Sequence, residues 1–502
     1  MFIVVAILAA FCMLISASSR VLRLFNSFAL IALLGLAGEM ILRVFCQGPQ
    51  SIWGGFFSWD ALSALLLGVI VVIAAYVIVY SFSYMEHEVA AGKVPQSRLP
   101  RYYFWVWMFI GTMLWVVSTP NLGLLWVGIE GTTLATALLV GFYREKTAVE
   151  AAWKYIVLCT VGISFALLGT MILYAASGRI NGYSLAALDW RLLVGMAPQL
   201  DPALVKLGCI FAFIGYGAKV GFVPMHPWLP DAHSQAPSPV SALLSGVLLN
   251  CALYAILRWH ILVRQTGLGP DFSGKLLLVF GLISLGAMMA FILLQKDIKR
   301  LLAYSSVEHM GIIALGLGLG TPLAVWGACF HLILHALTKA NLFVVVGRVV
   351  QMMGTRQIPK IRGVMSLWPY TGGILFMGLL AITGMPPFGT FRSEISIMAG
   401  FFQNHHPILG FLTALFLAVI FAGFLYHFLG MLFGTPGERC LKDKRDKGEG
   451  KEVLWLAVPM ILVLMLGVFV PEPLNQALNQ VVELILGRGG EYGEFGKLTQ
   501  LF

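Results

Sequence analysis

Three ionisable side chains recur at every fourth residue of one apolar segment, HLILHALTKANLF. They are His331, His335 and Lys339, and this spacing places them on one face of a helix. Histidine suits proton transfer because its unperturbed pKa lies near neutrality. The two histidines also resemble a zinc pair, but HLILH lacks the glutamate of HExxH and no third ligand is evident nearby. We therefore predict a proton-carrying face and no metal.

Single acids and bases interrupt other apolar segments. Glu130 lies midway through LLWVGIEGTTLATALLV, Lys219 and His226 lie in GYGAKVGFVPMHPWLPDAH, and Glu394 follows GMPPFGTFRS. An ionisable residue near the middle of a bilayer costs at least about 2.5–3.5 kcal/mol, so such residues are usually functional and paired. The alternative for Glu130 and Lys219 is a purely structural ion pair, although buried pairs stabilise a protein only weakly.

Three further ionisable residues fall in apolar segments. Glu39 lies in the segment 24–44, and Glu308 and His309 are expected to open the segment 301–319. Long polar side chains near the end of a membrane span can reach the interface and leave their charge in water. For Glu39 and Glu308 both a functional and a merely interfacial position remain open.

The composition excludes a water-soluble protein. The 502 residues are 59% hydrophobic and 11% charged, whereas soluble domains are about 25% charged. The seven cysteines are scattered without CxxC spacing, which argues against iron–sulfur, zinc and disulfide frameworks. No nucleotide-binding glycine motif is present. We expect an integral membrane protein with no cofactor of its own.

One crossing of a bilayer needs about 20 largely apolar residues. About fourteen segments of the sequence meet this requirement. The sequence thus predicts an all-α polytopic membrane protein. The predicted spans are residues 2–18, 24–44, 61–82, 103–119, 121–141, 152–176, 204–223, 239–260, 274–295, 301–319, 323–347, 366–390, 408–433 and 453–471.

The distribution of basic residues predicts the orientation. Roughly two thirds of the 33 Lys and Arg residues lie in loops after odd-numbered spans. Loops rich in Lys and Arg are usually cytoplasmic. The loop 434–452, which contains LKDKRDKGEGKE, is predicted to be a solvated cytoplasmic linker. Both termini are then expected outside the cytoplasm. The net charge of +10 reflects this topology and implies no nucleic-acid partner.

Two of the predicted spans are broken by proline and glycine. Pro224, Pro227 and Pro230 interrupt the seventh, and the GMPPFG run at 384–389 interrupts the twelfth. Such breaks persist at membrane depth only where protein or water satisfies the freed backbone groups. Their matching places predict two inverted five-span repeats, as in transporters. The expected division is 1–102 for the first three spans, 103–262 and 263–433 for the repeats, 434–452 for the charged loop, and 453–502 for the last span and tail.

Four ordered stretches resemble one superfamily, the antiporter-like subunits of respiratory complex I, Mrp-type cation/proton antiporters and membrane-bound hydrogenases. They are KVGFVPMHPWLPDAHSQAPSPVSALLSG (219–246), DIKRLLAYSSVEHMG (297–311), HLILHALTKANLF (331–343) and GMPPFGTFRSE (384–394). The resemblance extends over roughly residues 55–435. SGVLLNCALYAILR (245–258) and SSVEHMG are most similar to the hydrogenase-4 (formate hydrogenlyase) component F branch.

The resemblance implies a proton pathway. In such proteins a glutamate in span 5 and a lysine in span 7 gate proton passage, and these positions match Glu130 and Lys219. The usual lysine of span 8 falls at Asn250, which cannot carry a proton charge, so that one relay step is in doubt and water beside Asn250 is expected to bridge it. The carboxylate is expected to switch the lysine between holding and releasing a proton.

The remaining expected pathway residues belong to the second half of the chain and to the span-7 motif. Lys339 and His335 match the central positions of span 11, and Glu394 matches the terminal group of span 12. His331 and His226 complete the set. No metal or cofactor ligand is expected among them.

The resemblance also implies the partners and the membrane. Moving one charge against 100 mV costs about 2.3 kcal/mol, and nothing in this chain supplies that energy, so a redox partner is required. We expect a subunit that moves H⁺ (Na⁺ being the alternative) and leaves redox catalysis to cytoplasmic partners. Those partners would hold Fe–S clusters, and Ni–Fe in a hydrogenase. The expected location is the inner (plasma) membrane of a bacterium or archaeon, beside other membrane subunits.

Three alternative functions stay open. A Mrp-type cation/proton antiporter subunit would use the same fold without redox chemistry. A membrane scaffold for a cytoplasmic enzyme, such as a zinc-dependent carbon-uptake subunit, would not need the 331/335/339 face for transport. A quinone-reducing catalytic chain is disfavoured because the sequence shows no cofactor ligand set.

Overall fold

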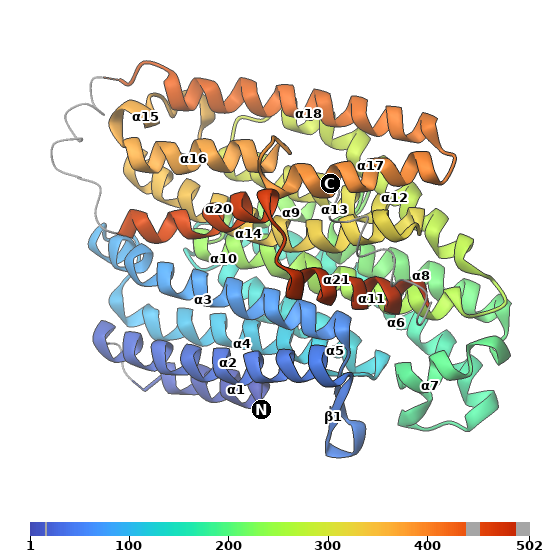
Figure 1. Ribbon diagram of the computed structural model, residues 1–502. Helices are drawn as coiled ribbons and strands as arrows, with labels where there is room; N and C mark the ends of the chain where they lie inside the picture. The colour runs from blue at the N-terminus through green and yellow to red at the C-terminus, as the bar shows by residue number, and fades with distance from the viewer. Residues whose placement is uncertain (16–17, 438–451, 488–502) are drawn as a thin grey trace.

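Long helices run side by side through the protein and form stacked rows (Figure 1). The computed structural model describes residues 1–15, 18–437 and 452–487. The first half contains α1 (Phe2–Met13), α2 (Ser19–Gln47), α3 (Ala61–Ala90), α4 (Leu99–Ser118), α5 (Leu122–Val140), α6 (Lys146–Asn181), α7 (Trp190–Gly195), α8 (Pro202–Val220), α9 (Trp228–Gln235), α10 (Ser238–Leu243) and α11 (Leu249–Arg264).

The second half continues the same arrangement. It contains α12 (Pro270–Leu293), α13 (Ile298–Leu319), α14 (Pro322–Met353), α15 (Val364–Leu367), α16 (Pro369–Ile382), α17 (Gly389–Gln403), α18 (Pro407–Phe433), α20 (Glu452–Val468) and α21 (Glu472–Leu486). A π-helical turn, η5 (Leu244–Leu248), joins α10 to α11, and β1 (Gln50–Ile52) pairs antiparallel with β2 (Phe57–Trp59). Short 3-10 turns lie at Trp53–Gly55, Gln96–Arg98, Leu185–Leu188, Ala197–Gln199 and Ile358–Lys360.

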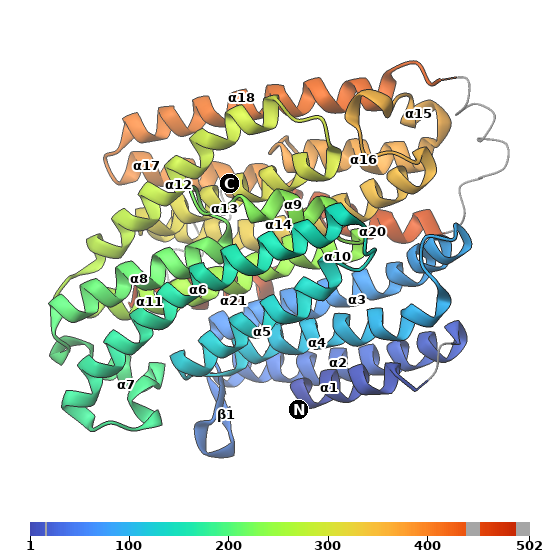
Figure 2. The same ribbon diagram turned by 180° about the vertical axis from the view of Figure 1, so that it is seen from behind.

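The helices form a bundle whose interior is mainly apolar and contains a smaller set of buried polar residues. α1 and α2 lie at one end of the stack and α18 at the other (Figure 1), while α5 and α6 cover the face seen in Figure 2. The apolar stretches of α2 and α18 are only 28% buried, whereas that of α14 is 94% buried. Peripheral helices thus offer apolar side chains to lipid, and α14 lies in the centre.

The length and composition of the helices support a multi-pass membrane protein. Within the described residues, ten helices are long and apolar enough to cross a membrane, and the bent pair α20–α21 would make eleven. Each of the fourteen predicted spans overlaps a helix. However, α1 and α16 are shorter than a full crossing, so the number fourteen stays a prediction.

The two predicted helix breaks are confirmed. α8 ends at Val220 and the chain restarts in α9, while α16 and α17 are separated by residues 383–388. Protein groups satisfy the freed backbone atoms: Ser284 Oγ accepts from the Val223 amide at 3.1 Å, and Trp228 Nε1 donates to the Ala218 carbonyl at 2.8 Å. Such satisfaction is what permits irregular backbone at membrane depth.

Some elements were not predicted. The β1–β2 hairpin and α7 lie between predicted spans, where the sequence predicts no regular structure, and α21 follows a 79° bend after α20. α21 buries Leu478, Val481 and Ile485 on one face, a spacing that indicates an amphipathic helix. Most of the charged loop, residues 438–451, lies outside the described residues.

Small residues bring α6 and α8 into close contact. A Cβ on Gly215 would lie 2.3 Å from the Ala166 amide nitrogen, and a Cβ on Gly169 would lie 2.5 Å from the Gly208 carbonyl oxygen. Close approach through small residues is a common way for membrane helices to pack. This contact sets the register of α6 against α8, and both helices carry residues of the site described below.

Substitution at this contact should destabilise the protein. We expect Gly215→Ala to lower the apparent melting temperature in detergent, because overpacking costs about 1–3 kcal/mol and exceeds the helix-propensity gain of at most about 1 kcal/mol. The matched control is Gly38→Ala in α2, where a Cβ meets nothing within 4 Å. Equal melting temperatures for the two variants would contradict this packing.

Candidate functional site

A buried lysine is the centre of the first polar cluster. Lys219 is 1% exposed, and its Nζ donates to Thr133 Oγ1 at 2.8 Å and to the Tyr155 hydroxyl at 2.7 Å. The ammonium also lies over the Tyr155 ring, 4.7 Å from its centroid. These contacts replace part of the hydration that the charge loses on burial.

The Glu130 carboxylate completes this first cluster. Glu130 Oε2 accepts from Thr133 Oγ1 at 3.2 Å, and Oε1 accepts from Thr160 Oγ1 at 3.0 Å. Since Thr133 donates to the carboxylate, its oxygen is the acceptor for Lys219. The acid and the base therefore communicate through one hydroxyl group, and their interaction differs from the direct ion pair that the structural alternative supposed.

Local sequence positions this cluster. Asn121 caps α5 by accepting from the Gly123 and Leu124 amides, which fixes the helix that carries Glu130 and Thr133. Gly221 ends α8 in the left-handed region with φ +87°, a conformation that glycine adopts without strain. Lys219 thus stands in the last turn of α8, where the helix dipole favours a cation.

The second polar cluster lies between α13 and α14. Lys339 is fully buried, and its Nζ donates to the Leu302 carbonyl at 3.0 Å. The Glu308 carboxylate interacts electrostatically with the Lys339 ammonium. The His309 ring on α13 lies 5.0 Å from the His331 ring and 5.4 Å from the His335 ring. The predicted common face of His331, His335 and Lys339 is confirmed, and it points at α13.

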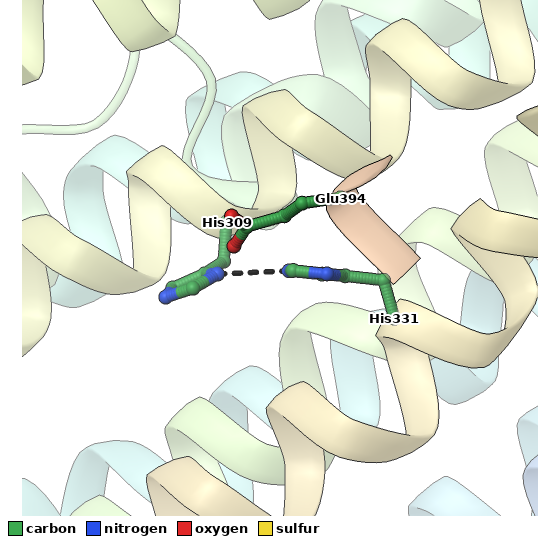
Figure 3. Close-up of side chains that lie close together, drawn as sticks. All are labelled: His309, His331 and Glu394. Carbon is green, nitrogen blue, oxygen red and sulfur yellow. Dashed lines mark hydrogen bonds between the residues drawn. The ribbon is translucent and has the colours of Figure 1, made fainter. Parts of the chain in front are cut away.

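A hydrogen-bonded chain links the histidines to α17, and Figure 3 shows its first bond, between His309 and His331. His309 Nδ1 lies 2.8 Å from His331 Nε2, and His331 Nδ1 lies 2.8 Å from Ser393 Oγ. Ser393 Oγ donates to the Thr390 carbonyl at 2.8 Å, so it accepts from His331 Nδ1–H. His331 Nε2 is consequently the bare nitrogen, and neutral His309 donates from Nδ1.

Glu394 joins this chain from the second turn of α17, just after the break between α16 and α17. Its carboxylate and the facing nitrogens of His309 and His331 lie within 4.8 Å of one another. A Cβ on Gly384 would lie 2.2 Å from Glu394 Oε2, so glycine at 384 leaves room for the carboxylate. The sequence suggested no third ligand beside the HLILH pair, whereas the structure brings His309 and Glu394 to His331.

Two of the open positions are now decided. Glu308 is 3% exposed and lies in the middle of α13, so the interfacial reading of Glu308 is wrong and the expectation that Glu308 and His309 open this segment is also wrong. The predicted span begins at residue 301, but α13 already begins at Ile298 and includes the basic residues Lys299 and Arg300. Glu308 and His309 therefore lie in the middle of the helix. Glu39, in contrast, lies on an exposed surface of α2 and pairs with Arg43 one turn later.

Two predicted pathway residues lie in neither cluster. Asn250 is fully buried, its Nδ2 donates to the Gly246 carbonyl at 2.9 Å, and its Oδ1 has no hydrogen-bond partner among the described residues. It follows directly on the π-helical turn η5, and such turns are frequent at functional positions. His226 instead packs against the Phe291 and Tyr304 rings.

Comparison with known proteins identifies the family. The profile described as "NADH:quinone oxidoreductase/Mrp antiporter, TM" matches residues 119–421, and the one described as "NADH-Ubiquinone oxidoreductase (complex I), chain 5 N-terminus" matches residues 56–93. The first match covers more than half of the chain. The chain belongs to the NADH:quinone oxidoreductase/Mrp antiporter family. All the residues of both clusters fall within the first match.

Individual relatives of this antiporter-like chain agree with that assignment. It is 37% identical over 446 residues to a hydrogenase-4 component F homolog of Methylacidiphilum infernorum, covering 88% of this chain and 90% of the relative. The fold matches a chain of the membrane-bound sulfane sulfur reductase, an archaeal respiratory membrane complex, with TM-score 0.83, 24% identity and coverage of 99% and 98%. The Mrp complex of Dietzia sp. gives TM-score 0.81 at 18% identity, with coverage of 99% and 98%.

The sequence reading missed several members of the antiporter-like site. Thr133, Thr160, Tyr155 and Ser393 supply the hydroxyl groups that connect the ionisable residues. Thr133 lies one helical turn after Glu130, which is the one spacing in the sequence that hinted at it. The other three lie on other helices, Tyr155 and Thr160 on α6 and Ser393 on α17, so only the packing of these helices reveals them.

The Thr133 hydroxyl should contribute more to the stability of the folded protein than the Thr132 hydroxyl does. We expect Thr133→Val to lower the stability of the folded protein by about 1.5–3 kcal/mol, because hydrogen bonds to charged groups are worth that much and Lys219 stays buried. Thr132→Val is the control, since Thr132 Oγ1 donates only to the Ile129 carbonyl at 2.6 Å. Apparent melting temperatures in detergent measure both, and an equal loss would mean that Lys219 does not depend on Thr133.

Proposed function

We propose that this chain is the proton-translocating membrane subunit of a complex I-like respiratory assembly of the hydrogenase type, in which partner subunits carry out the redox chemistry. The observation that carries the proposal is the pair of buried clusters, Glu130–Thr133–Lys219 and Glu308–Lys339 with its histidines. Charged groups deep in a membrane protein are costly and mark ion or proton routes.

We further propose the fourteen-span topology with two inverted repeats. Neighbour packing supports it: α4 packs on α5 and α5 on α6 in the first block, while α12 packs on α13 and α13 on α14 in the second. Each block then contains one broken span, α8–α9 and α16–α17. The Lys- and Arg-rich loops support the proposal that both termini lie outside the cytoplasm, and the proposed membrane is the plasma membrane of a bacterium or archaeon.

A polar cavity supports an intake route from the predicted cytoplasmic side. The cavity of about 440 Å³ is lined by Glu88, Lys93, Lys299 and Arg356 among others, and these residues lie at the ends of odd-numbered spans. Buried Lys299 donates to the Ala236 carbonyl at 2.6 Å. His233, fully buried, interacts electrostatically with both Lys299 and Lys339. Water in the cavity would deliver protons through these groups to Lys339.

The first cluster would act as the switch. Burial disfavours the charged form of a lysine, and a nearby carboxylate favours it. Rotation of Thr133 would connect or disconnect Glu130 from Lys219, so Lys219 would hold its proton in one state and release it in the other. Asn250 lies between the clusters in sequence and offers a free Oδ1, where a water molecule would complete the connection.

The second cluster would carry the proton onward. From Lys339 the chain of His335, His309 and His331 leads to Glu394. Histidine and lysine nitrogens dominate this route, whereas hard cations prefer several oxygen ligands. H⁺ is therefore the proposed ion, with Na⁺ as the alternative.

Energy for pumping would come from partner subunits. In the proposal, other membrane subunits and cytoplasmic redox subunits with Fe–S clusters, and Ni–Fe in a hydrogenase, accompany this chain. The likeness to a hydrogenase-4 component F homolog supports that choice. A Mrp-type antiporter is the second candidate, because the matching profile covers both groups. Co-purification of iron- or nickel-containing subunits favours the first, and small metal-free membrane partners favour the second.

Removal of either charge in the first cluster should uncouple ion pumping from electron transfer. In membrane vesicles that hold the assembled complex, we expect Glu130→Gln and Lys219→Ala to lower the number of protons moved per electron by this subunit's share. Glu39→Gln is the control, because Glu39 is an exposed carboxylate paired with Arg43. An unchanged ratio in an intact complex with Glu130→Gln would defeat the proposed function.

A further inference from the structure

His309, His331 and Glu394 together form a set of ligands typical of transition metals. Their ligand atoms lie within 4.8 Å of one another, and both histidines are buried (Figure 3). Two histidine nitrogens and one carboxylate oxygen are the protein ligands of many zinc sites that keep a fourth position for water. The three residues come from α13, α14 and α17, so their spacing in the sequence does not predict a common metal site.

The hydrogen bonds of His331 prepare it as a ligand. Ser393 Oγ accepts from His331 Nδ1–H, because the same hydroxyl donates to the Thr390 carbonyl. His331 Nε2 is therefore bare and faces His309 Nδ1. A second partner that fixes the tautomer of a histidine in this way is a regular feature of metal sites.

The distances require only small movements. His309 Nδ1 and His331 Nε2 are 2.8 Å apart, and two ligands of a tetrahedral zinc ion with Zn–N bonds of about 2.0–2.1 Å stand about 3.3 Å apart. Among the described residues no protein group donates a hydrogen bond to the Glu394 carboxylate, and this side chain is only partly buried. It can therefore move toward the histidines.

The local charge also favours a cation. The Glu308 and Glu394 carboxylates lie within electrostatic range of each other, and Lys339 is the cation that interacts with Glu308. A divalent ion would take the place of the Nδ1 proton that His309 shares with His331, and His309 would then carry its single proton on Nε2 and stay neutral.

We infer that His309, His331 and Glu394 bind a divalent transition-metal ion such as Zn²⁺. This metal site goes beyond the proposed function, because the binding of a metal ion does not require that the chain transports protons. A bound ion would occupy three groups of the second cluster and so block it. The inference concerns a binding site of this chain, and it can fail while the proposed proton pathway stands.

The test measures metal binding by the full chain in detergent. His405 and His406, an exposed adjacent pair, are first replaced by Gln in every sample to remove a surface site. Co²⁺ is titrated and its visible absorption followed, and Zn²⁺ is then added in competition. We expect one tight site per chain with a tetrahedral spectrum, which Zn²⁺ displaces.

Variants then locate the ion. His331→Gln, His309→Gln and Glu394→Gln should each weaken binding at least about 100-fold, and Ser393→Ala about 10–100-fold, as outer partners of metal ligands do. His335→Gln should bind as the parent does, because His335 lies in the cluster but outside the ligand set. Weak binding by the parent, or equal binding by His331→Gln, would overturn the inference.

A variant that keeps all three ligand residues separates loss of metal binding from misfolding. Gly384→Ala places a Cβ 2.2 Å from Glu394 Oε2 and should weaken Co²⁺ binding by displacing the carboxylate. Gly354→Ala is the control, because Gly354 has nearly the same φ, +68° against +63°, and its Cβ meets nothing within 4 Å. Equal binding by these two folded variants would show that Glu394 is not a ligand.

Discussion

The cost of placing a charged group away from water governs the whole architecture. Lys219 and Lys339 are buried in a bundle whose outer surface is apolar, and each has polar partners on neighbouring helices. For Lys219 these are a threonine and a tyrosine hydroxyl, and for Lys339 a backbone carbonyl and the Glu308 carboxylate. These partners replace part of the hydration that each ammonium loses on burial.

Packing and chemistry depend on each other in this bundle. Glycines let α6 approach α8, which brings Tyr155 to Lys219, and Gly384 leaves space for Glu394 at the break before α17. The same helix breaks that interrupt regular structure leave their amides and carbonyls satisfied by side chains from α9 and α12. The break after α8 thus follows Lys219 closely while protein side chains satisfy backbone groups beside it.

Sequence alone predicted the membrane class, the helix breaks and the common face of His331, His335 and Lys339, because each follows from composition or from spacing within one segment. It could not predict which helices touch. The hydroxyl of Thr160, the position of His309 opposite His331, and the interior position of Glu308 all depend on packing between distant segments. The amphipathic pattern of α21 was visible in the sequence and was overlooked.

The proposed proton pathway needs a continuous hydrogen-bonded route between the two clusters, and we propose water at Asn250, whose Oδ1 has no partner among the described residues, as part of that route. A high-resolution cryo-electron microscopy map of the assembled complex would test this directly, because ordered water is visible in such maps. The account predicts water bound to Asn250 Oδ1 and hydrogen-bonded chains of water from there toward Lys219 and Lys339. Apolar side chains that fill this space, with no water between the clusters, would contradict it.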